Sequence, residues 1–256
     1  MLNPREELMQ LLRSLNLSQM AALVEPIALR AAKEGLTHEA FLLELVRGEQ
    51  AAKRARRMNR LIQQSDLAPA KTFDNLNTDR FDAVTKLRVN ELKSGAFLKD
   101  AINIVAIGNP GVGKSHLACA LGYALIGEEY SVKFVTTSTL MQQLLAAKRD
   151  LCLPKAIAKL DRFECLILDD IGYVQHNRDE MEVLFTLLAE RYERKSVIIT
   201  TNLVFSEWER IFKDPMTTAA AIDRVVHHSV VLDLMEVESY RAESAKAQSK
   251  KRPAMA

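Results

Sequence analysis

The segment from Gly108 to Ser115 reads Gly-Asn-Pro-Gly-Val-Gly-Lys-Ser, which has the residue types and spacing of a phosphate-binding loop. An apolar run rich in β-branched residues precedes this loop, and a helical pattern follows it from Lys114 to Ile126. A strand, a glycine loop and a helix in this order aim backbone N–H groups and the positive helix end at one point, which suits a triphosphate. An ordinary glycine turn is the alternative, but it does not require this pattern. The sequence therefore predicts that the chain binds a nucleoside triphosphate.

Two residues of this loop are expected to meet the charge of the nucleotide. The Lys114 ammonium would neutralise the β- and γ-phosphates, both in the bound nucleotide and during its hydrolysis. The Ser115 hydroxyl would hold Mg²⁺. Glycines let the backbone approach the phosphates closely. The predicted nucleotide contacts are Gly108, Asn109, Pro110, Gly111, Val112, Gly113, Lys114, Ser115 and His116.

Two adjacent carboxylates, Asp169 and Asp170, end a second apolar run that begins at Cys165. We expect Asp169 to orient the Mg²⁺ shell through water, and Asp170 to position or deprotonate the attacking water. A strand that ends in a plain polar turn is the alternative. The phosphate loop upstream favours the catalytic interpretation.

Asn202 follows a third apolar run and is the next candidate for catalysis. An amide at this strand tip could hydrogen-bond the attacking water and sense the γ-phosphate. The alternative is that Asn202 caps the helical segment that begins near Phe205. We favour the sensing role because the carboxylate pair and the phosphate loop are also present.

The elements that must position these residues follow from the hydrophobic pattern. Short apolar runs alternate with helical segments, which predicts an α/β fold with a five-stranded parallel sheet between helices. Ligands in such sheets bind at the carboxyl ends of the strands, where the predicted site residues occur. The predicted strands are Ile102–Ile107, Val132–Val135, Cys165–Leu168, Val197–Thr200 and Val230–Leu234.

The chain before this alternation is predicted to be all-helical. Asn3 caps a first helix, Ser18 opens a second and Thr37 caps a third, and Gly48 is expected to kink the third. We therefore predict a helical DNA- or partner-binding domain over residues 1–66.

Three further boundaries complete the predicted organisation. Residues 67–76 form a linker and residues 77–241 form the nucleotide-binding domain, whose first helix Thr78 is expected to cap. Residues 242–256 are basic and low in apolar residues, so we expect a disordered tail.

The third predicted helix carries a dense group of cations. Such a segment surrounds a helix with positive charge and could neutralise phosphates along a groove of duplex DNA. A solvated helix face is the alternative. The candidate DNA contacts here are Lys53, Arg54, Arg56, Arg57 and Arg60, and we call them the basic segment.

Composition adds little about partners but more about setting. The chain has 256 residues and a net charge of +2, which alone argues nothing. Cys119, Cys152 and Cys165 show neither disulfide nor metal spacing, and core packing explains Cys119 and Cys165. The N-terminus is charged and lacks an apolar signal core, and no segment could span a membrane. We expect a cytoplasmic protein.

The motifs in this order resemble those of AAA+ ATPases, and finer segments resemble the IstB/DnaC branch. The resemblance covers about Lys71 to Arg241. The helical N-terminus with its Arg-rich end also resembles IstB proteins, which are ATP-dependent helpers of insertion-sequence transposases. The segments that carry it are Gly-Lys-Ser-His-Leu-Ala at 113–118, Leu-Asp-Asp-Ile-Gly at 168–172, Arg-Tyr-Glu-Arg-Lys-Ser at 191–196, the run 221–229 and Glu-Ser-Tyr-Arg at 238–241.

The resemblance implies a bacterial AAA+ ATPase that uses ATP and Mg²⁺. It would assemble as an ATP-dependent homo-oligomer on duplex DNA, mostly regardless of sequence, and recruit a cognate transposase. It implies that Arg224 is an arginine finger for a neighbouring subunit, and that Lys148 and Arg149 face DNA. A DnaC-like loader of a replicative helicase is the alternative, whereas a P-loop kinase gives no reason for Asn202 and Arg224 to occur together.

Two departures from the AAA+ pattern also give expectations. Asp170 stands where many AAA+ enzymes carry Glu, so water activation would be less efficient. Few residues follow Arg241, so we expect no full C-terminal helical lid, and the role of Arg241 as a second sensor stays open.

Overall fold

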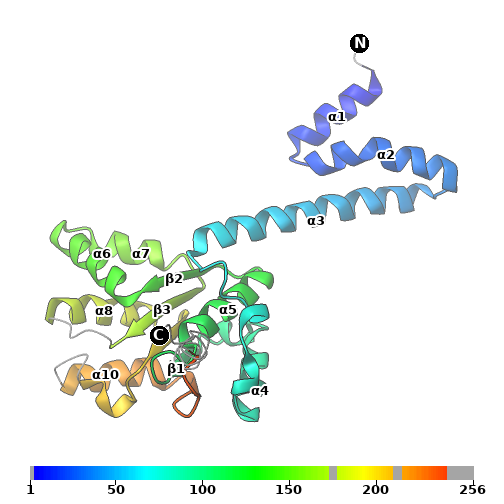
Figure 1. The fold of residues 1–256 in the computed structure, drawn as a ribbon. Helices are drawn as coiled ribbons and strands as arrows, with labels where there is room; N and C mark the ends of the chain where they lie inside the picture. Colours follow the sequence, from blue (N-terminus) through cyan, green and yellow to red (C-terminus); the bar gives the residue numbers. More distant parts are fainter. Residues whose placement is uncertain (1–2, 173–177, 210–214, 241–256) are drawn as a thin grey trace, which may run out of the picture. The chain divides into compact units, whose positions relative to one another are not determined.

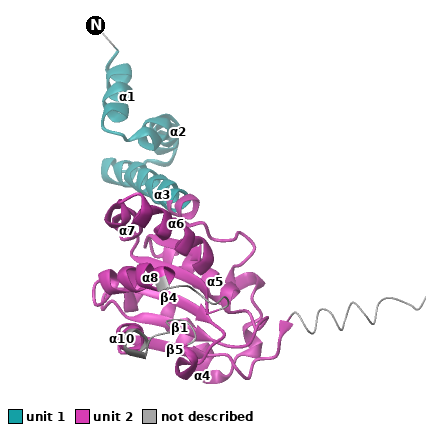
Figure 2. Ribbon diagram, turned by 90° about the vertical axis from the view of Figure 1, so that its left-hand side faces the viewer, with its two compact units in different colours: residues 1–60 teal, residues 61–256 magenta. Residues whose placement is uncertain are grey.

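The computed structural model describes residues 3–172, 178–209 and 215–240 (Figure 1). The chain divides into two compact units, residues 1–60 and 61–256 (Figure 2). Helix α3, His38–Ser65, runs across this boundary. The residues predicted as a linker, 67–76, belong to the second unit, where the Leu67 side chain is buried in the core. Arg241 and the basic tail lie outside the described residues.

The first unit consists of α1, Pro4–Ser14, α2, Ser18–Glu34, and most of α3, and its helices begin where the sequence predicts. The Asn3 side chain accepts a hydrogen bond from the backbone N–H of Arg5, 3.1 Å away, because a helix start leaves N–H groups unpaired. The Thr37 hydroxyl accepts in the same way from Ala40 N–H, at 3.2 Å. A small core joins these helices through Leu12, Met20, Ile27 and Leu45.

Helix α3 continues without interruption through Gly48, and the kink expected at this residue stays a prediction. A Cβ atom added at Gly48 would collide with the Leu23 side chain of α2. The glycine therefore allows two helices to approach closely, and the surrounding helix tolerates its low propensity.

The second unit is built on one five-stranded sheet with the order β2-β3-β4-β1-β5. All four strand pairs are parallel, as predicted. The strands are β1, Asn103–Ile107, β2, Val132–Thr136, β3, Cys165–Ile171, β4, Ser196–Thr201, and β5, Ser229–Asp233.

Helices cover both faces of the sheet, because its strands are apolar on both sides (Figure 1). Ile104 and Ala106 pack into the core on the side of α5, whereas Val105 and Ile107 pack into the core that α6 and α8 share. No helix among the described residues is long and apolar enough to cross a membrane. The α-helices described in this unit are α4 (Ala83–Leu92), α5 (Lys114–Gly127), α6 (Thr137–Arg149), α7 (Leu153–Leu160), α8 (Arg178–Arg191) and α10 (Pro215–Val226). Short 3-10 turns lie at Phe73–Asn75, Thr78–Arg80, Ala96–Leu98 and Phe205–Glu207.

Two details of this unit test sequence predictions. Asp82 caps α4, since its carboxylate accepts from Thr85 N–H at 2.7 Å, so the prediction that Thr78 is the cap is wrong. Cys119 and Cys165 are fully buried, as predicted for core residues, and burial raises the pKa of the Cys165 thiol to about 12.

Candidate nucleotide-binding site

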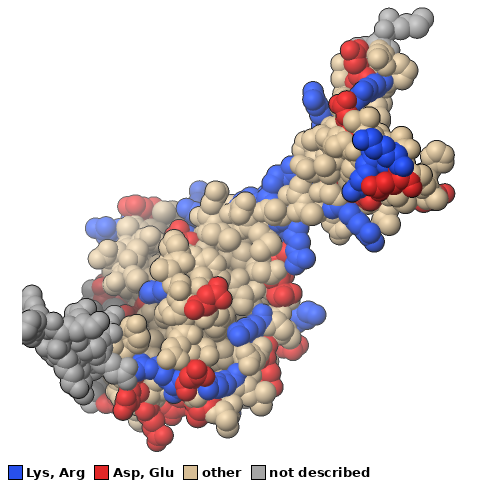
Figure 3. All heavy atoms as spheres, turned by 45° about the vertical axis from the view of Figure 1, so that its right-hand side comes forward, with Lys and Arg blue, Asp and Glu red and all other residues tan. Residues whose placement is uncertain are grey.

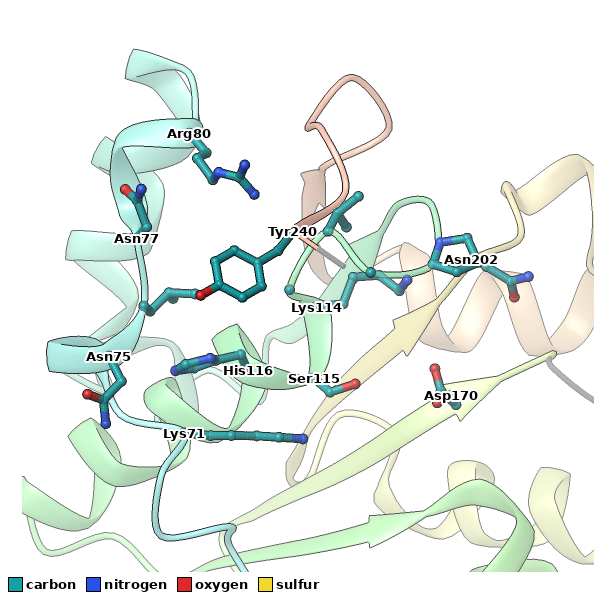
Figure 4. A pocket seen from close by; sticks show the side chains of 15 residues that line it. Lys71, Asn75, Asn77, Arg80, Lys114, Ser115, His116, Asp170, Asn202 and Tyr240 are labelled. Atoms are coloured by element: carbon teal, nitrogen blue, oxygen red, sulfur yellow. The ribbon is translucent and has the colours of Figure 1, made fainter. Parts of the chain in front are cut away.

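A pocket of about 750 Å³ lies at the carboxyl ends of the central strands (Figure 4). It is lined by the loop from Pro110 to His116, by the strand-tip residues Asp170 and Asn202, and by Tyr240. Its remaining wall comes from the segment that follows α3, through Lys71, Asn75, Leu76, Asn77 and Arg80. The phosphate loop and both strand tips therefore meet where the fold predicts a ligand.

The loop needs glycine at three of its positions for two different reasons. Gly111 and Gly113 have φ angles of 88° and 102°, in the left-handed region that glycine adopts without strain. At Gly108 an added Cβ would lie 2.9 Å from the carbonyl oxygen of Leu234, so the backbone there tolerates no side chain. Helix α5 begins directly after the loop, at Lys114, and its N-terminal N–H groups favour an anion.

The Lys114 ammonium is buried beneath the loop. It donates to the carbonyl oxygens of Gly108, 2.8 Å away, and Asn109, 3.1 Å away. Gly108 and Asn109 do not line the pocket themselves but support the loop, and the Asn109 amide also donates to the Met235 carbonyl at 3.1 Å. A triphosphate in the pocket would replace these neutral acceptors with charged oxygens, which bind an ammonium more strongly.

His116 lines the pocket, but its ring holds a neighbouring segment. Its Nε2–H donates to the carbonyl oxygen of Thr72, 2.9 Å away. The imidazole therefore ties the first turn of α5 to the segment predicted as the linker. Its contribution to a phosphate would come from the backbone N–H in the first helical turn.

A β-bulge in β3 gives the two carboxylates different surroundings. The register with β4 shifts between Leu168 and Ile171, and Asp170 has a φ of 61°, which Asp tolerates better than most residues. Asp169 is only 5% exposed and does not line the pocket, whereas Asp170 is exposed and does. This arrangement fits one carboxylate that orients a metal shell and another that meets water.

Thr200 in β4 holds the carboxylate of Asp169 and the backbone of Asp170 in place, and sequence reasoning missed it. Its hydroxyl donates to Asp169 Oδ1 at 2.6 Å and accepts from the backbone N–H of Asp170 at 2.9 Å. A buried threonine in an apolar run is typical of strand packing, so the sequence held no signal for this role.

Asn202 lies at the tip of β4 and lines the same pocket as Asp170 (Figure 4). The 3-10 turn that follows begins after Val204, and no side chain caps it among the described residues. The capping alternative is therefore not supported, and Asn202 is positioned to contact a ligand.

Two oxygen donors beside the loop fit a magnesium ion. Ser115 lines the pocket, and one Asp169 oxygen is held by Thr200 while the second is not used in that bond. Mg²⁺ prefers oxygen ligands and keeps several waters, so few protein ligands suffice when phosphates supply the others. Ser115 and Asp169 would hold this ion, Asp169 through water.

Tyr240 and Arg80 complete the mouth of the pocket, and neither was predicted. The backbone N–H of Tyr240 donates to the Gly111 carbonyl at 3.0 Å, and the Arg80 guanidinium lies 5.5 Å from the centre of the Tyr240 ring. The Glu-Ser-Tyr-Arg motif contains Tyr240 and was the signal for it in the sequence, whereas Arg241 of the same motif lies outside the described residues.

Arg224 does not line the pocket of its own chain. It lies near the end of α10, where its guanidinium packs over the Phe185 ring of α8, 4.4 Å from the ring centre. Its Nη1 atom is buried and has no hydrogen-bond partner among the described residues. An arginine finger that acts on another subunit must lie away from its own pocket, as Arg224 does.

Comparison with known proteins identifies the family. The model of the IstB-like ATP binding proteins matches residues 10–249. The chain belongs to this family. An insertion-sequence ATP-binding protein of Sinorhizobium fredii is 43% identical over 92% of this chain and 79% of its own length. The ATP-binding protein of insertion sequence IS21 from Pseudomonas aeruginosa is 34% identical over 92% of this chain and 88% of its own.

Solved structures show that this IstB-like protein has the AAA+ P-loop fold. DnaA from Aquifex aeolicus, bound to AMPPCP, matches 75% of this chain and 58% of its own, with a TM-score of 0.56 and 16% identity. The DnaC helicase loader matches 65% of this chain and 99% of its own, with a TM-score of 0.53 and 19% identity. At such identities the likeness shows the fold alone.

The basic segment of this IstB-like protein lies on α3, and all of its cations are exposed. Lys and Arg side chains gather along this helix in Figure 3. One member has a structural role, because Arg56 donates to Glu49 Oε1 at 2.9 Å and to the Ser18 hydroxyl at 3.1 Å. Lys53, Arg54, Arg57 and Arg60 stay candidates for DNA contact.

Glu49 explains why Arg56 is needed there. Its buried carboxylate accepts from the backbone N–H groups of Gln19, at 2.7 Å, and Met20, at 2.9 Å, and so caps the start of α2. Burial opposes ionisation, but these N–H groups and the Arg56 guanidinium outweigh it and hold the pKa of Glu49 below its usual value. Because this pKa is lowered, ionised Glu49 stabilises the unit at pH values above its pKa in the unfolded chain. This stability is lost as the pH falls through the lower pKa of Glu49 in the folded unit.

Replacing Glu49 with alanine is expected to destabilise the first unit by about 1–3 kcal/mol, because the buried N–H of Met20 and the part-buried N–H of Gln19 lose their acceptor. Hydrogen exchange at the start of α2 should become faster. Gln50→Ala is the matched control, because the neighbouring side chain is exposed. Equal exchange in the two variants would contradict the capping role of Glu49.

The two DNA candidates at the end of α6 differ from each other. Lys148 forms ion pairs with Asp179, at 3.1 Å, and Glu182, at 2.9 Å, and these hydrogen bonds, led by Glu182, raise the pKa of its ammonium. Arg149 is exposed. Two carboxylates already balance the charge of Lys148, so Arg149 is the better candidate for a phosphate contact.

Proposed function

We propose that this protein is an ATPase that binds duplex DNA and assists the transposase of an insertion sequence. The observation that carries the proposal is the division of the site. The pocket holds the phosphate loop, Asp170 and Asn202, whereas Arg224 lies outside it. The names of the relatives support the link to insertion sequences and to ATP. We place this activity in the bacterial cytoplasm.

The geometry supports hydrolysis by in-line attack of water. The Lys114 ammonium and the N-terminal N–H groups of α5 would bind the β- and γ-phosphates and stabilise the charge that develops there. Asp170 would accept a proton from the attacking water. The water oxygen bonds to the γ-phosphorus while the bond between the γ-phosphorus and the bridging β-phosphate oxygen breaks. Asn202 would orient this water, and Thr200 keeps Asp170 in position through its backbone. Bound Mg²⁺ supplies charge neutralisation at the phosphates.

The position of Arg224 supports ATP-dependent assembly. A guanidinium directed at the γ-phosphate of a neighbouring subunit stabilises the charge that is spread over the leaving phosphoryl group. A head-to-tail assembly of this kind repeats one interface along the oligomer. Because ATP would lie in that interface, it would favour the assembled state.

DNA binding and transposase recruitment are the remaining parts of the proposal. The exposed cations of α3 suit sequence-independent contact with phosphates, and an oligomer would present many copies of them along one duplex. We propose that the assembly on target DNA recruits the transposase and that hydrolysis resets it. The loader alternative rests on the likeness to DnaC, which shows the fold alone.

The division of the site can be tested by mixing two inactive variants. Asp170→Asn and Arg224→Ala should each bind ATP but hydrolyse it at less than about a tenth of the wild-type rate. An equal mixture should recover up to about a quarter of the activity, because random pairing places one intact finger beside one intact water-positioning site in a quarter of interfaces. The measurement is phosphate release after subunit exchange.

The control for this experiment is Arg162→Ala, which removes an exposed arginine of the same unit. Alone, it should hydrolyse ATP at the wild-type rate. In an equal mixture with Asp170→Asn, the activity should equal that of the Arg162→Ala subunits present and no more. Absence of rescue in mixtures that exchange subunits would show that Arg224 does not act across a subunit boundary.

A further inference from the structure

Lys71 extends into the nucleotide pocket from a different side than Lys114. Figure 4 shows its side chain running toward Ser115, the candidate metal ligand. Lys71 is half-buried, and in the part of the chain that the structure describes its ammonium group has no hydrogen bond or ion pair. Partial removal of water from a lysine ammonium without a compensating partner costs free energy. This position therefore suits a residue that binds an anionic ligand.

The surroundings of Lys71 place its charge at the phosphate end of the pocket. Cys119 lies one helical turn beyond Ser115 in α5, and burial raises the pKa of its thiol. Lys71 and Asp169 both act electrostatically on this thiol, in opposite directions. Lys71 and Ser115 line the same pocket, so the ammonium lies where phosphates and their metal ion would bind.

The backbone around Lys71 is fixed to the helix that carries the phosphate loop. His116 donates to the Thr72 carbonyl at 2.9 Å, and the Tyr123 hydroxyl donates to the Leu67 carbonyl at 3.3 Å. Within the segment, the backbone N–H of Lys71 donates to the Ala68 carbonyl at 3.0 Å. Because both sides of Lys71 are held, its long side chain has a defined route into the pocket.

We propose that Lys71 is a second phosphate-binding lysine of the nucleotide site. The segment that follows the basic helix in sequence would then contact the nucleotide directly, and phosphate binding would further stabilise its packing on α5. This inference rests on the proposed binding of ATP in the pocket, and it adds a cation from outside the phosphate loop.

The test compares a neutral and a charged replacement by titration with methylanthraniloyl-ATP. Lys71→Met keeps the length and the apolar stem but removes the charge, and it should weaken binding about 5- to 30-fold. Lys71→Arg keeps the charge and should restore most of the affinity. Hydrogen exchange over residues 67–77 should slow on addition of ATP in the wild-type protein and in Lys71→Arg, and much less in Lys71→Met.

Lys93→Met is the matched control, because the Lys93 ammonium lies over the Phe73 ring of the same segment, 4.2 Å from its centre, and does not line the pocket. It should bind the nucleotide like the wild-type protein. Unchanged affinity in Lys71→Met, or an equal loss in Lys71→Arg, would overturn the inference while ATP binding stands. If neither the wild-type protein nor the control bound the nucleotide, the proposed function itself would fail.

Discussion

Replacing Lys114 with alanine is expected to weaken ATP binding by roughly 100-fold or more, since charge-assisted bonds to two phosphates are lost. The ammonium is buried beneath the loop, where it donates to the carbonyls of Gly108 and Asn109. Without this ammonium, only backbone N–H dipoles in this part of the loop would balance the charge of the triphosphate. Titration with methylanthraniloyl-ATP measures the effect.

Lys99→Ala is the control for this variant, because it removes an exposed lysine of the same unit that lies outside the pocket. Circular dichroism should show that both variants fold. Equal ATP affinity in Lys114→Ala and the wild-type protein would contradict the phosphate-loop interpretation, and with it the proposed roles of Ser115 and Asp169.

The features that local sequence determines could be predicted closely. The strand limits differ from the predictions by a few residues at most, because each strand is a short apolar run between polar segments. The phosphate loop was equally clear, since Gly111 and Gly113 adopt backbone angles that other residues avoid. The order of the strands in the sheet was not predicted, because apolar runs do not specify their neighbours.

The features that depend on contacts distant in sequence could not be predicted. Thr200 holds the Asp169 carboxylate and the Asp170 backbone through bonds that exist only once β3 and β4 pair with a bulge. Lys71 enters the pocket because the segment after α3 packs on α5, and its position in sequence suggested only a linker. The same holds for Arg56, because its partner Glu49, two turns away on the same face of α3, also binds the start of α2.

The basic segment carries the second large prediction, which concerns duplex DNA. Replacing Lys53, Arg54, Arg57 and Arg60 with alanine should weaken binding on the order of 100- to 1,000-fold at 0.1 M salt. Each phosphate contact contributes a slope of about 0.9 in log K against log salt, so the slope should flatten by about two to four units. Arg56 is kept in this variant because it supports Glu49 and thus the fold of the unit. Hydrolysis of ATP without DNA should survive.

A charge-matched control separates local contact from net charge. Replacing Arg13, Lys33, Lys99 and Arg162, which are exposed and spread over both units, changes the charge equally and should leave the slope nearly unchanged. ATP should tighten DNA binding in this control and in the wild-type protein, because assembly adds avidity, and Arg224→Ala should lose that gain. Unchanged affinity and slope in the variant of the basic segment would exclude α3 from DNA binding. A wild-type protein that ignored duplex DNA but bound a replicative helicase would favour the loader, because the exposed cations of α3 would then serve a protein surface instead of phosphates.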